Sequence, residues 1–162
     1  MRSPFANCDA VLKHEPATAK FRGESYNYIY HYYECEQTHE RFTTTEIDEE
    51  NTRQVYDQYR KKYGIPSPEE IKRVKADYGL SNAKLAAILG FGENQIAYYL
   101  DGEVPSNSNG KTLSVIRNPI VMEAYVDNAR HQLGEKAYHK IKERLAMQKD
   151  LVLTAEELQP AL

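Results

Sequence analysis

The chain has 162 residues, of which 41% are hydrophobic and 28% are charged, and its formal net charge is −3. This length suits one compact domain or two small ones, and the composition is ordinary for a globular protein. Basic and acidic residues nearly balance within 1–65, 66–126 and 127–162, which excludes a protein that binds nucleic acid through a strongly basic region alone.

The compartment is predicted from the apolar runs and the cysteines. No apolar run approaches the roughly 18 residues that a bilayer-spanning helix needs, and the polar residues 1–4 lack the apolar stretch of a secretory signal. The two cysteines, Cys8 and Cys35, give no disulfide framework for a chain of this length. We therefore expect a cytoplasmic protein with no membrane partner.

Residues 1–42 are expected to form short β-strands. Tyrosines alternate along 26–33 with the period of two that is typical of a strand, and residues 21–24 offer a turn before them. Clustered tyrosines can also provide a contact surface, but filling a small sheet is the simpler interpretation. The side chains expected to hold this module together are Phe5, Val11, Leu12 and the tyrosines.

A connecting helix is predicted over 45–63. Thr43 and Glu46 have the spacing of a capping box at its start, and residues 60–62 place positive charge in its last turn. The segment 64–68, with one glycine and two prolines, ends the helix and marks a boundary between modules.

Beyond this boundary the chain reads as helical. The predicted helices are 68–78, 82–89, 93–100, 107–116, 119–132 and 135–149. The last is amphipathic through Ala137, Tyr138, Ile141 and Leu145. The segment 127–162 extends a dimer interface, packs on the N-terminal sheet or leads to a partner, and the sequence does not decide among these. The predicted fold class is α+β, with a β-rich module and connecting helix (1–65), a helical domain (66–126) and a helical extension (127–162).

Residues 80–103 have the features of a helix-turn-helix. Ala86 is small enough for a second helix to approach the first, and 90–92 can form the tight turn between them. The residues that give both helices an apolar inner face are Leu85, Ile88, Leu89, Ile96 and Tyr99. Those that we expect to face outward on the second helix are Glu93, Asn94, Gln95, Ala97 and Tyr98.

The pattern Leu-Ser-x-x-x-Leu-Ala-x-x-Leu-Gly from residue 80, followed by a turn and an Ile…Tyr helix that ends before a glycine, resembles the XRE (Cro/CI-like repressor) helix-turn-helix over 68–126. The alternative is an ordinary helical hairpin with the same periodicity. The resemblance implies a protein that binds double-stranded operator DNA.

The whole arrangement over 1–126 is similar to the MqsA (YgiT-type) antitoxins, and it includes Phe21-Arg22-Gly23 and the Gly92-x-Asn94 step. Those proteins join a zinc-binding, toxin-binding N-terminal domain to an XRE domain that dimerises and represses its own operon. The resemblance therefore implies a toxin protein as partner and a homodimer.

The zinc site of that family is degenerate in this chain. Its two Cys-x-x-Cys pairs match Ser3, Ala6, Cys35 and Thr38, of which only Cys35 can supply a thiolate. An improvised site of Cys8, Cys35, His31 and His39 has irregular spacing. We therefore expect no metal and no cofactor.

The resemblance also implies which residues contact DNA. Asn94 matches an asparagine that reads a base, and its amide can pair with adenine, whereas Tyr98 replaces an arginine and can touch a thymine methyl or a phosphate. Gln95 is a second candidate reader. The expected contacts to the DNA backbone are Ser81, Asn82, Lys84, Ser106, Asn107 and Lys111.

Three functions follow from these patterns. The first is an antitoxin that represses transcription of a type II toxin–antitoxin operon. The second is a stand-alone XRE-type transcriptional regulator. The third is a protein-interaction module with a decayed helix-turn-helix, which the low basic charge and the missing arginine favour. An enzyme is not expected, because the five histidines are scattered and no phosphate-binding loop or H-E-x-x-H pattern occurs.

Overall fold

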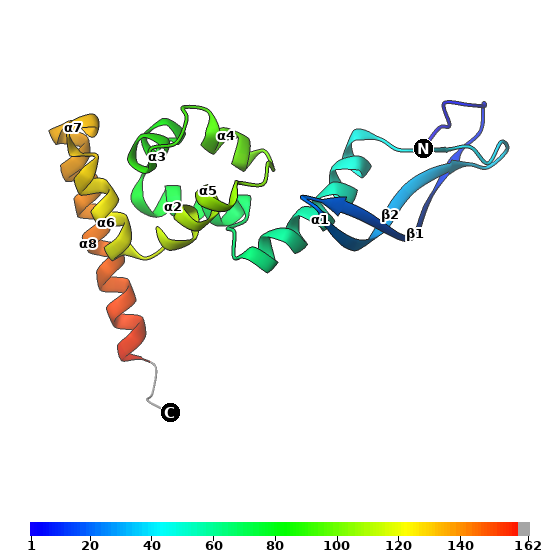
Figure 1. The fold of residues 1–162 in the computed structure, drawn as a ribbon. Helices are drawn as coiled ribbons and strands as arrows, with labels where there is room; N and C mark the ends of the chain where they lie inside the picture. Colours follow the sequence, from blue (N-terminus) through cyan, green and yellow to red (C-terminus); the bar gives the residue numbers. More distant parts are fainter. Residues whose placement is uncertain (159–162) are drawn as a thin grey trace. The chain divides into compact units, whose positions relative to one another are not determined.

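The computed structural model describes residues 1–158 and has an α+β fold (Figure 1). Contacts divide the chain into two compact units, Met1–Lys62 and Tyr63–Leu162. The extension 127–162 belongs to the same unit as the preceding helices, and its residues 159–162 lie outside the described residues.

The first unit is a long β-hairpin with a short third strand and one helix. Its elements are β1 (Ala10–Phe21), β2 (Glu24–Cys35), β3 (Arg41–Phe42) and α1 (Thr45–Tyr63). The sheet is antiparallel in the order β1-β2-β3. Arg22 and Gly23 form the hairpin loop with φ of 50° and 81°, and a two-residue type I′ turn requires positive φ at both positions. The predicted turn is confirmed, but strands of 12 residues replace the short ones expected, because the pairing runs unbroken from this turn.

Helix α1 covers one face of the hairpin with aromatic and aliphatic side chains. Val55 and Tyr59 are buried, as is Tyr26 on β2. The ring of Tyr59 lies edge-on to that of Phe21, with 5.0 Å between the centroids. Tyr26 of the tyrosine-rich strand therefore lies in an interface with α1, where its ring contacts that of Tyr59.

The same helix also supplies hydrogen bonds to the edge of β2 that lacks a strand partner. Side-chain amides spaced three and four residues apart on α1 meet every second residue of the strand. Asn51 exchanges two bonds with the His31 backbone (2.8 and 2.9 Å), Gln54 two with Ile29 (3.0 and 2.8 Å), and Gln58 donates one to the Asn27 carbonyl (2.9 Å). This row of amides satisfies backbone groups that an exposed strand edge would leave open.

Two expectations for this unit are wrong. Phe5, Val11 and Leu12 are 46%, 44% and 50% exposed, because the pairs that Val11 and Leu12 make on β2 lie beyond the stretch that α1 contacts. The cap of α1 is Thr44 rather than Thr43. The helix begins one residue later than a Thr43 cap requires, and Thr44 Oγ1 accepts from the Ile47 amide at 3.4 Å.

The second unit is helical. Its elements are α2 (Pro68–Tyr78), α3 (Asn82–Leu89), α4 (Gln95–Leu100), α5 (Asn107–Val115), α6 (Pro119–Asn128), α7 (Arg130–Leu133) and α8 (Glu135–Glu157). The first two have the predicted bounds. The other four differ. Helix α4 begins two residues late and α5 ends one residue early, at Val115. A break at Ala129 divides the helix expected over 119–132, and α8 continues past 149 to Glu157.

One apolar core joins the helices of this unit. Fully or almost fully buried side chains come from α3, α4, α5, α6 and α8, and include Leu85, Ile96, Leu113, Met122 and Leu145. The face of α8 predicted to be apolar packs into this core through Tyr138, Ile141 and Leu145. Among the described residues, no helix combines the length and the apolar character needed to cross a bilayer.

Candidate nucleic-acid interface

Helices α3 and α4 are joined by a tight turn and packed closely. Leu85 and Ala86 on α3 are 0% and 1% exposed. Gly90 ends α3 with a φ of 70°, which favours glycine, and the Phe91 amide donates to the Ala86 carbonyl at 2.9 Å. Phe91 is half-buried against the core, with its ring edge-on to that of Tyr99. The turn therefore has the form that the sequence predicts.

Helix α4 has one buried face and one exposed face. Ile96 and Tyr99 are 0% and 3% exposed and point into the core, as expected. On the other side Glu93 and Asn94 are exposed, and Tyr98 is 50% exposed. Because Asn94 and Tyr98 lie four residues apart, they share the outer face of this short helix. Two of the three predicted base contacts are thus brought together on one accessible surface.

Gln95, the third predicted base contact, is held inside the molecule instead. Its side chain is half-buried, and its Oε1 accepts from Tyr99 Oη at 2.6 Å and from Asn109 Nδ2 at 3.0 Å. Asn109 Nδ2 also lies 2.7 Å from Tyr99 Oη, to which it donates. Gln95 therefore does not face outward as expected: it fixes α4 to α5. Sequence reasoning missed Asn109, because its link to Gln95 depends on how α5 folds back.

The predicted backbone contacts lie at the starts of α3 and α5. Ser81 and Ser106 are exposed N-caps, each accepting a bond of 3.2 Å from the amide three residues on, so each hydroxyl keeps its proton for an outside acceptor. Asn107, Lys84 and Lys111 are exposed. Such helix starts suit phosphate oxygens, because amide groups and the helix dipole favour negative charge there.

Asn82 is the exception in this group. It is half-buried, and its Oδ1 is buried without a hydrogen-bond partner. A carbonyl oxygen cannot bind a phosphate oxygen, so only the amide nitrogen of Asn82 can serve the predicted role.

The charge on this surface is mixed. Lys84 and Lys111 are exposed, and so are Glu93, Asp101 and Glu103. Two lysines per chain attract a polyanion only weakly when carboxylates lie in the same region of the sequence. Any recognition by this surface must depend on the direct contacts of α4 more than on charge.

The positions considered for zinc in the sequence, Ser3, Ala6, Cys35 and Thr38, lie in the other unit, where Cys8 lies next to Cys35. Cys8 Sγ lies 3.0 Å from Cys35 Sγ, while His39 bonds to Glu34. Within residues 1–158, no group of three or more histidine, cysteine or acidic side chains has the arrangement of a metal site. The absence of a metal remains a prediction.

No family model and no curated protein matches this chain.

Proposed function

We propose that this protein is a transcription regulator that binds double-stranded operator DNA through an XRE-type helix-turn-helix formed by α3 and α4. The observation that carries the proposal is the two-sided character of α4. Its inner face is anchored by Ile96 and Tyr99, and its outer face presents Asn94 and Tyr98. A recognition helix needs a rigid inner side and polar outer side chains that reach base edges.

In this proposal Asn94 pairs with an adenine, and Tyr98 packs on a thymine methyl or donates to a phosphate. Tyrosine cannot hold guanine with two hydrogen bonds as arginine does, so the preferred sites are rich in A·T pairs. Ser81, Ser106, Lys84 and Lys111 would position the helix on the DNA backbone.

The experiment is a selection from random duplexes, followed by anisotropy titration of the selected site. Asn94→Ala should weaken binding to that site by about 1–3 kcal/mol and relax the preference at one base position. Asn128→Ala, which removes another exposed asparagine from this unit, is the matched control and should leave affinity unchanged. Equal, weak affinity for every duplex, unaffected by Asn94→Ala, would favour the interaction-module alternative.

We propose further that the regulator is an antitoxin, with a toxin bound by the first unit. Strand β1 supports this, because it lies at the edge of the sheet and pairs with β2 alone among the described strands. Backbone groups at such an edge can bind another protein. Co-purification with the product of the adjacent gene tests the antitoxin role separately from DNA binding.

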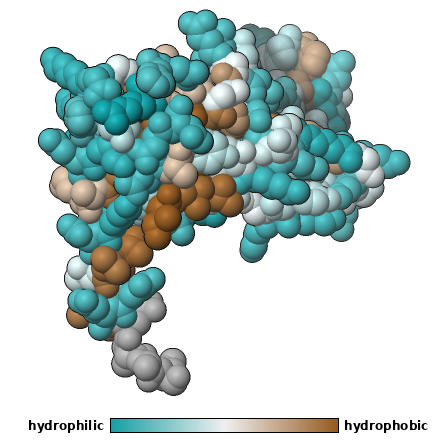
Figure 2. Space-filling model, turned by 60° about the vertical axis from the view of Figure 1, so that its left-hand side comes forward, coloured by the Kyte–Doolittle hydropathy of each residue, from teal (hydrophilic) through white to brown (hydrophobic). Residues whose placement is uncertain are grey.

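A homodimer completes the proposal. The C-terminal part of α8 carries exposed apolar side chains, and Figure 2 shows them as brown atoms along the helix that leads to the grey terminus. They are Met147 (60% exposed), Leu151 (62%), Leu153 (57%) and Leu158 (78%). A second copy would bury this surface, and sedimentation equilibrium measures whether it does.

A further inference from the structure

The first unit contains a close pair of cysteines that the proposed function does not use. Cys8 precedes β1 and Cys35 is the last residue of β2, yet their sulfur atoms are 3.0 Å apart. The register brings them together, because Ala10 pairs with Cys35 across the hairpin. Cys35 is 0% exposed, whereas Cys8 is only half-buried, so solvent reaches the pair from one side.

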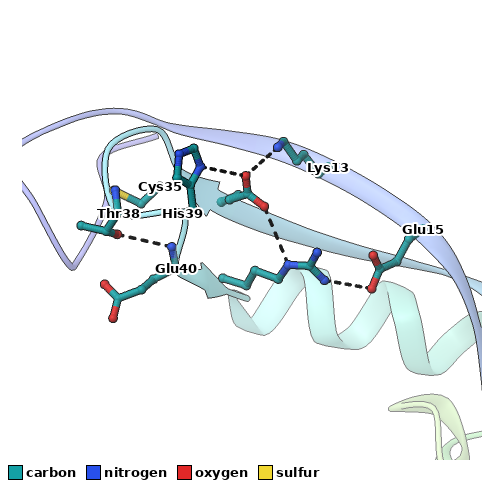
Figure 3. A network of polar contacts seen from close by, with 8 residues as sticks. Lys13, Glu15, Cys35, Thr38, His39 and Glu40 are labelled. Atoms are coloured by element: carbon teal, nitrogen blue, oxygen red, sulfur yellow. Dashed lines mark hydrogen bonds and ion pairs between the residues drawn. The ribbon is translucent and has the colours of Figure 1, made fainter.

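The segment before β1 is folded back to present Cys8. The Ser3 amide donates to the Cys8 carbonyl at 2.9 Å, and the Ala10 amide donates to the Met1 carbonyl at 2.8 Å. The open end of the hairpin, where Cys35 lies, is held by an ion pair between β1 and β2. Lys13 bonds to Glu34 at 2.6 Å, and Figure 3 shows this ion pair beside Cys35. A segment of bends, mostly exposed, therefore lies against the end of β2.

The surroundings of Cys35 favour its thiolate. Hydrogen bonds from Cys8, Ser3 and Thr38 lower the pKa of Cys35 to about 6, and the Thr38 amide lies 3.5 Å from its sulfur. The hydrogen bond to Cys35 in turn raises the pKa of Cys8, so Cys8 remains a thiol under conditions in which Cys35 ionises. This arrangement, an accessible thiol beside a buried thiolate, is that of a pair ready for thiol–disulfide exchange.

We propose that Cys8 and Cys35 form a reversible redox pair that closes to a disulfide in the presence of a small-molecule disulfide such as oxidised glutathione. Cys8 loses its proton and attacks one glutathione sulfur, which releases one glutathione and leaves a mixed disulfide. The Cys35 thiolate then attacks Cys8 Sγ and displaces the second glutathione. The two protein sulfurs are oxidised by two electrons, and the glutathione disulfide is reduced to two glutathione molecules. The first to leave takes the proton of Cys8, and the second leaves as a thiolate that takes its proton from water.

Closure needs little movement. A disulfide has sulfur atoms about 2.0 Å apart, so the pair must approach by about 1 Å, and the exposed segment before β1 can supply that shift. The bond would fix the N-terminal segment to the end of β2.

The test uses the full chain, oxidised with glutathione disulfide, blocked with an alkylating reagent and cleaved with trypsin without reductant. Cleavage after Arg22 separates the two cysteines, so a closed pair links peptide 3–13 to peptide 23–41. We expect this linked pair, a loss of about 2 Da in the intact mass, and return to the dithiol with dithiothreitol. Cys8→Ser is the control and should give neither the link nor the mass loss.

Three results would overturn the proposal. The first is a stable glutathione adduct on Cys8 with no peptide link. The second is a disulfide between two chains in place of the internal one. The third is one zinc ion per chain that stays bound when the reduced protein is loaded with zinc and then dialysed. Circular dichroism must show that Cys8→Ser is folded. If the folded variant forms no linked peptides, the disulfide of the unchanged protein is the one between Cys8 and Cys35.

Discussion

Asn51 should be the most important polar contact between α1 and the sheet. It is 6% exposed, and its amide makes two hydrogen bonds to the His31 backbone, of 2.8 and 2.9 Å. Replacing it with alanine leaves one amide and one carbonyl group of a half-buried residue without these partners. A buried polar group left unsatisfied costs about 1–3 kcal/mol, so Asn51→Ala should lower the free energy of unfolding of this unit by about 2–4 kcal/mol.

Gln54 provides an internal comparison. It makes the same two bonds to Ile29, but these are exposed, so water replaces them when the side chain is removed. Gln54→Ala should therefore cost less than about 1 kcal/mol. Asn51→Asp should not restore the stability of the unchanged protein, because a carboxylate can accept from the His31 amide but cannot donate to the His31 carbonyl.

The assay must report on the first unit alone, because a chain with two units need not unfold in one transition. Hydrogen exchange of the β2 amides, measured by mass spectrometry on peptide 23–41, does so. Asn51→Ala should speed exchange along this peptide far more than Gln54→Ala. Equal effects of the two variants would refute the idea that burial makes the Asn51 bonds valuable.

Two further predictions concern the second unit. A Cβ at Gly110 would lie 2.8 Å from Ile65 Cγ1 and 3.2 Å from Ile65 Cδ1, so Gly110→Ala should lower stability by about 1–3 kcal/mol in urea unfolding. Ile65→Val in the same chain removes Cδ1 and should recover a small part of the loss. Lys142 and then Lys149 lower the pKa of Glu123, so its contribution to stability is full above its unfolded pKa and is lost as pH falls through the lower folded value. The urea midpoint should therefore fall between about pH 5 and 3, and Glu123→Gln should flatten that part of the profile; a parallel profile would contradict this.

Local signals in the sequence predicted much of the fold. Pro68 follows the cap Ser67, which forms a full capping box with Glu70, and Gly79 ends α2 in the left-handed conformation. These interactions involve residues within three or four positions, so the pattern alone fixes both ends of the helix. The bounds of α3 and the hairpin turn were predictable for the same reason.

Contacts between distant segments were not predictable. The approach of Cys8 to Cys35 depends on the strand register, and the half-buried state of Gln95 depends on where α5 places Asn109. The alternating pattern of a strand also does not reveal how much of the sheet a helix will cover. For this reason Val11 was expected in the core, whereas the structure leaves it 44% exposed. Asn94 and Tyr98 are exposed as expected, whereas Gln95 is half-buried because Asn109 of α5 binds it. Contact of these residues with DNA remains a prediction.

The Gln95 contact also bears on how a protein with few basic residues could recognise DNA. Helix α4 has only six residues, and isolated helices shorter than about 12 residues are barely stable in water. Its shape must therefore come from its neighbours: Ile96 in the core, and Gln95 joined to Tyr99 and Asn109. A helix fixed in this way presents Asn94 without an ordering cost at binding, so affinity can come from well-aligned base contacts and not from charge. By this argument the titration of the selected site should have a shallow salt dependence. Lys84 and Lys111 neutralise about two phosphates per chain, so the slope should be about −1.8 for one chain and about −3.6 for the proposed homodimer. A much steeper slope would place the binding on a basic surface elsewhere and remove the role assigned to α4.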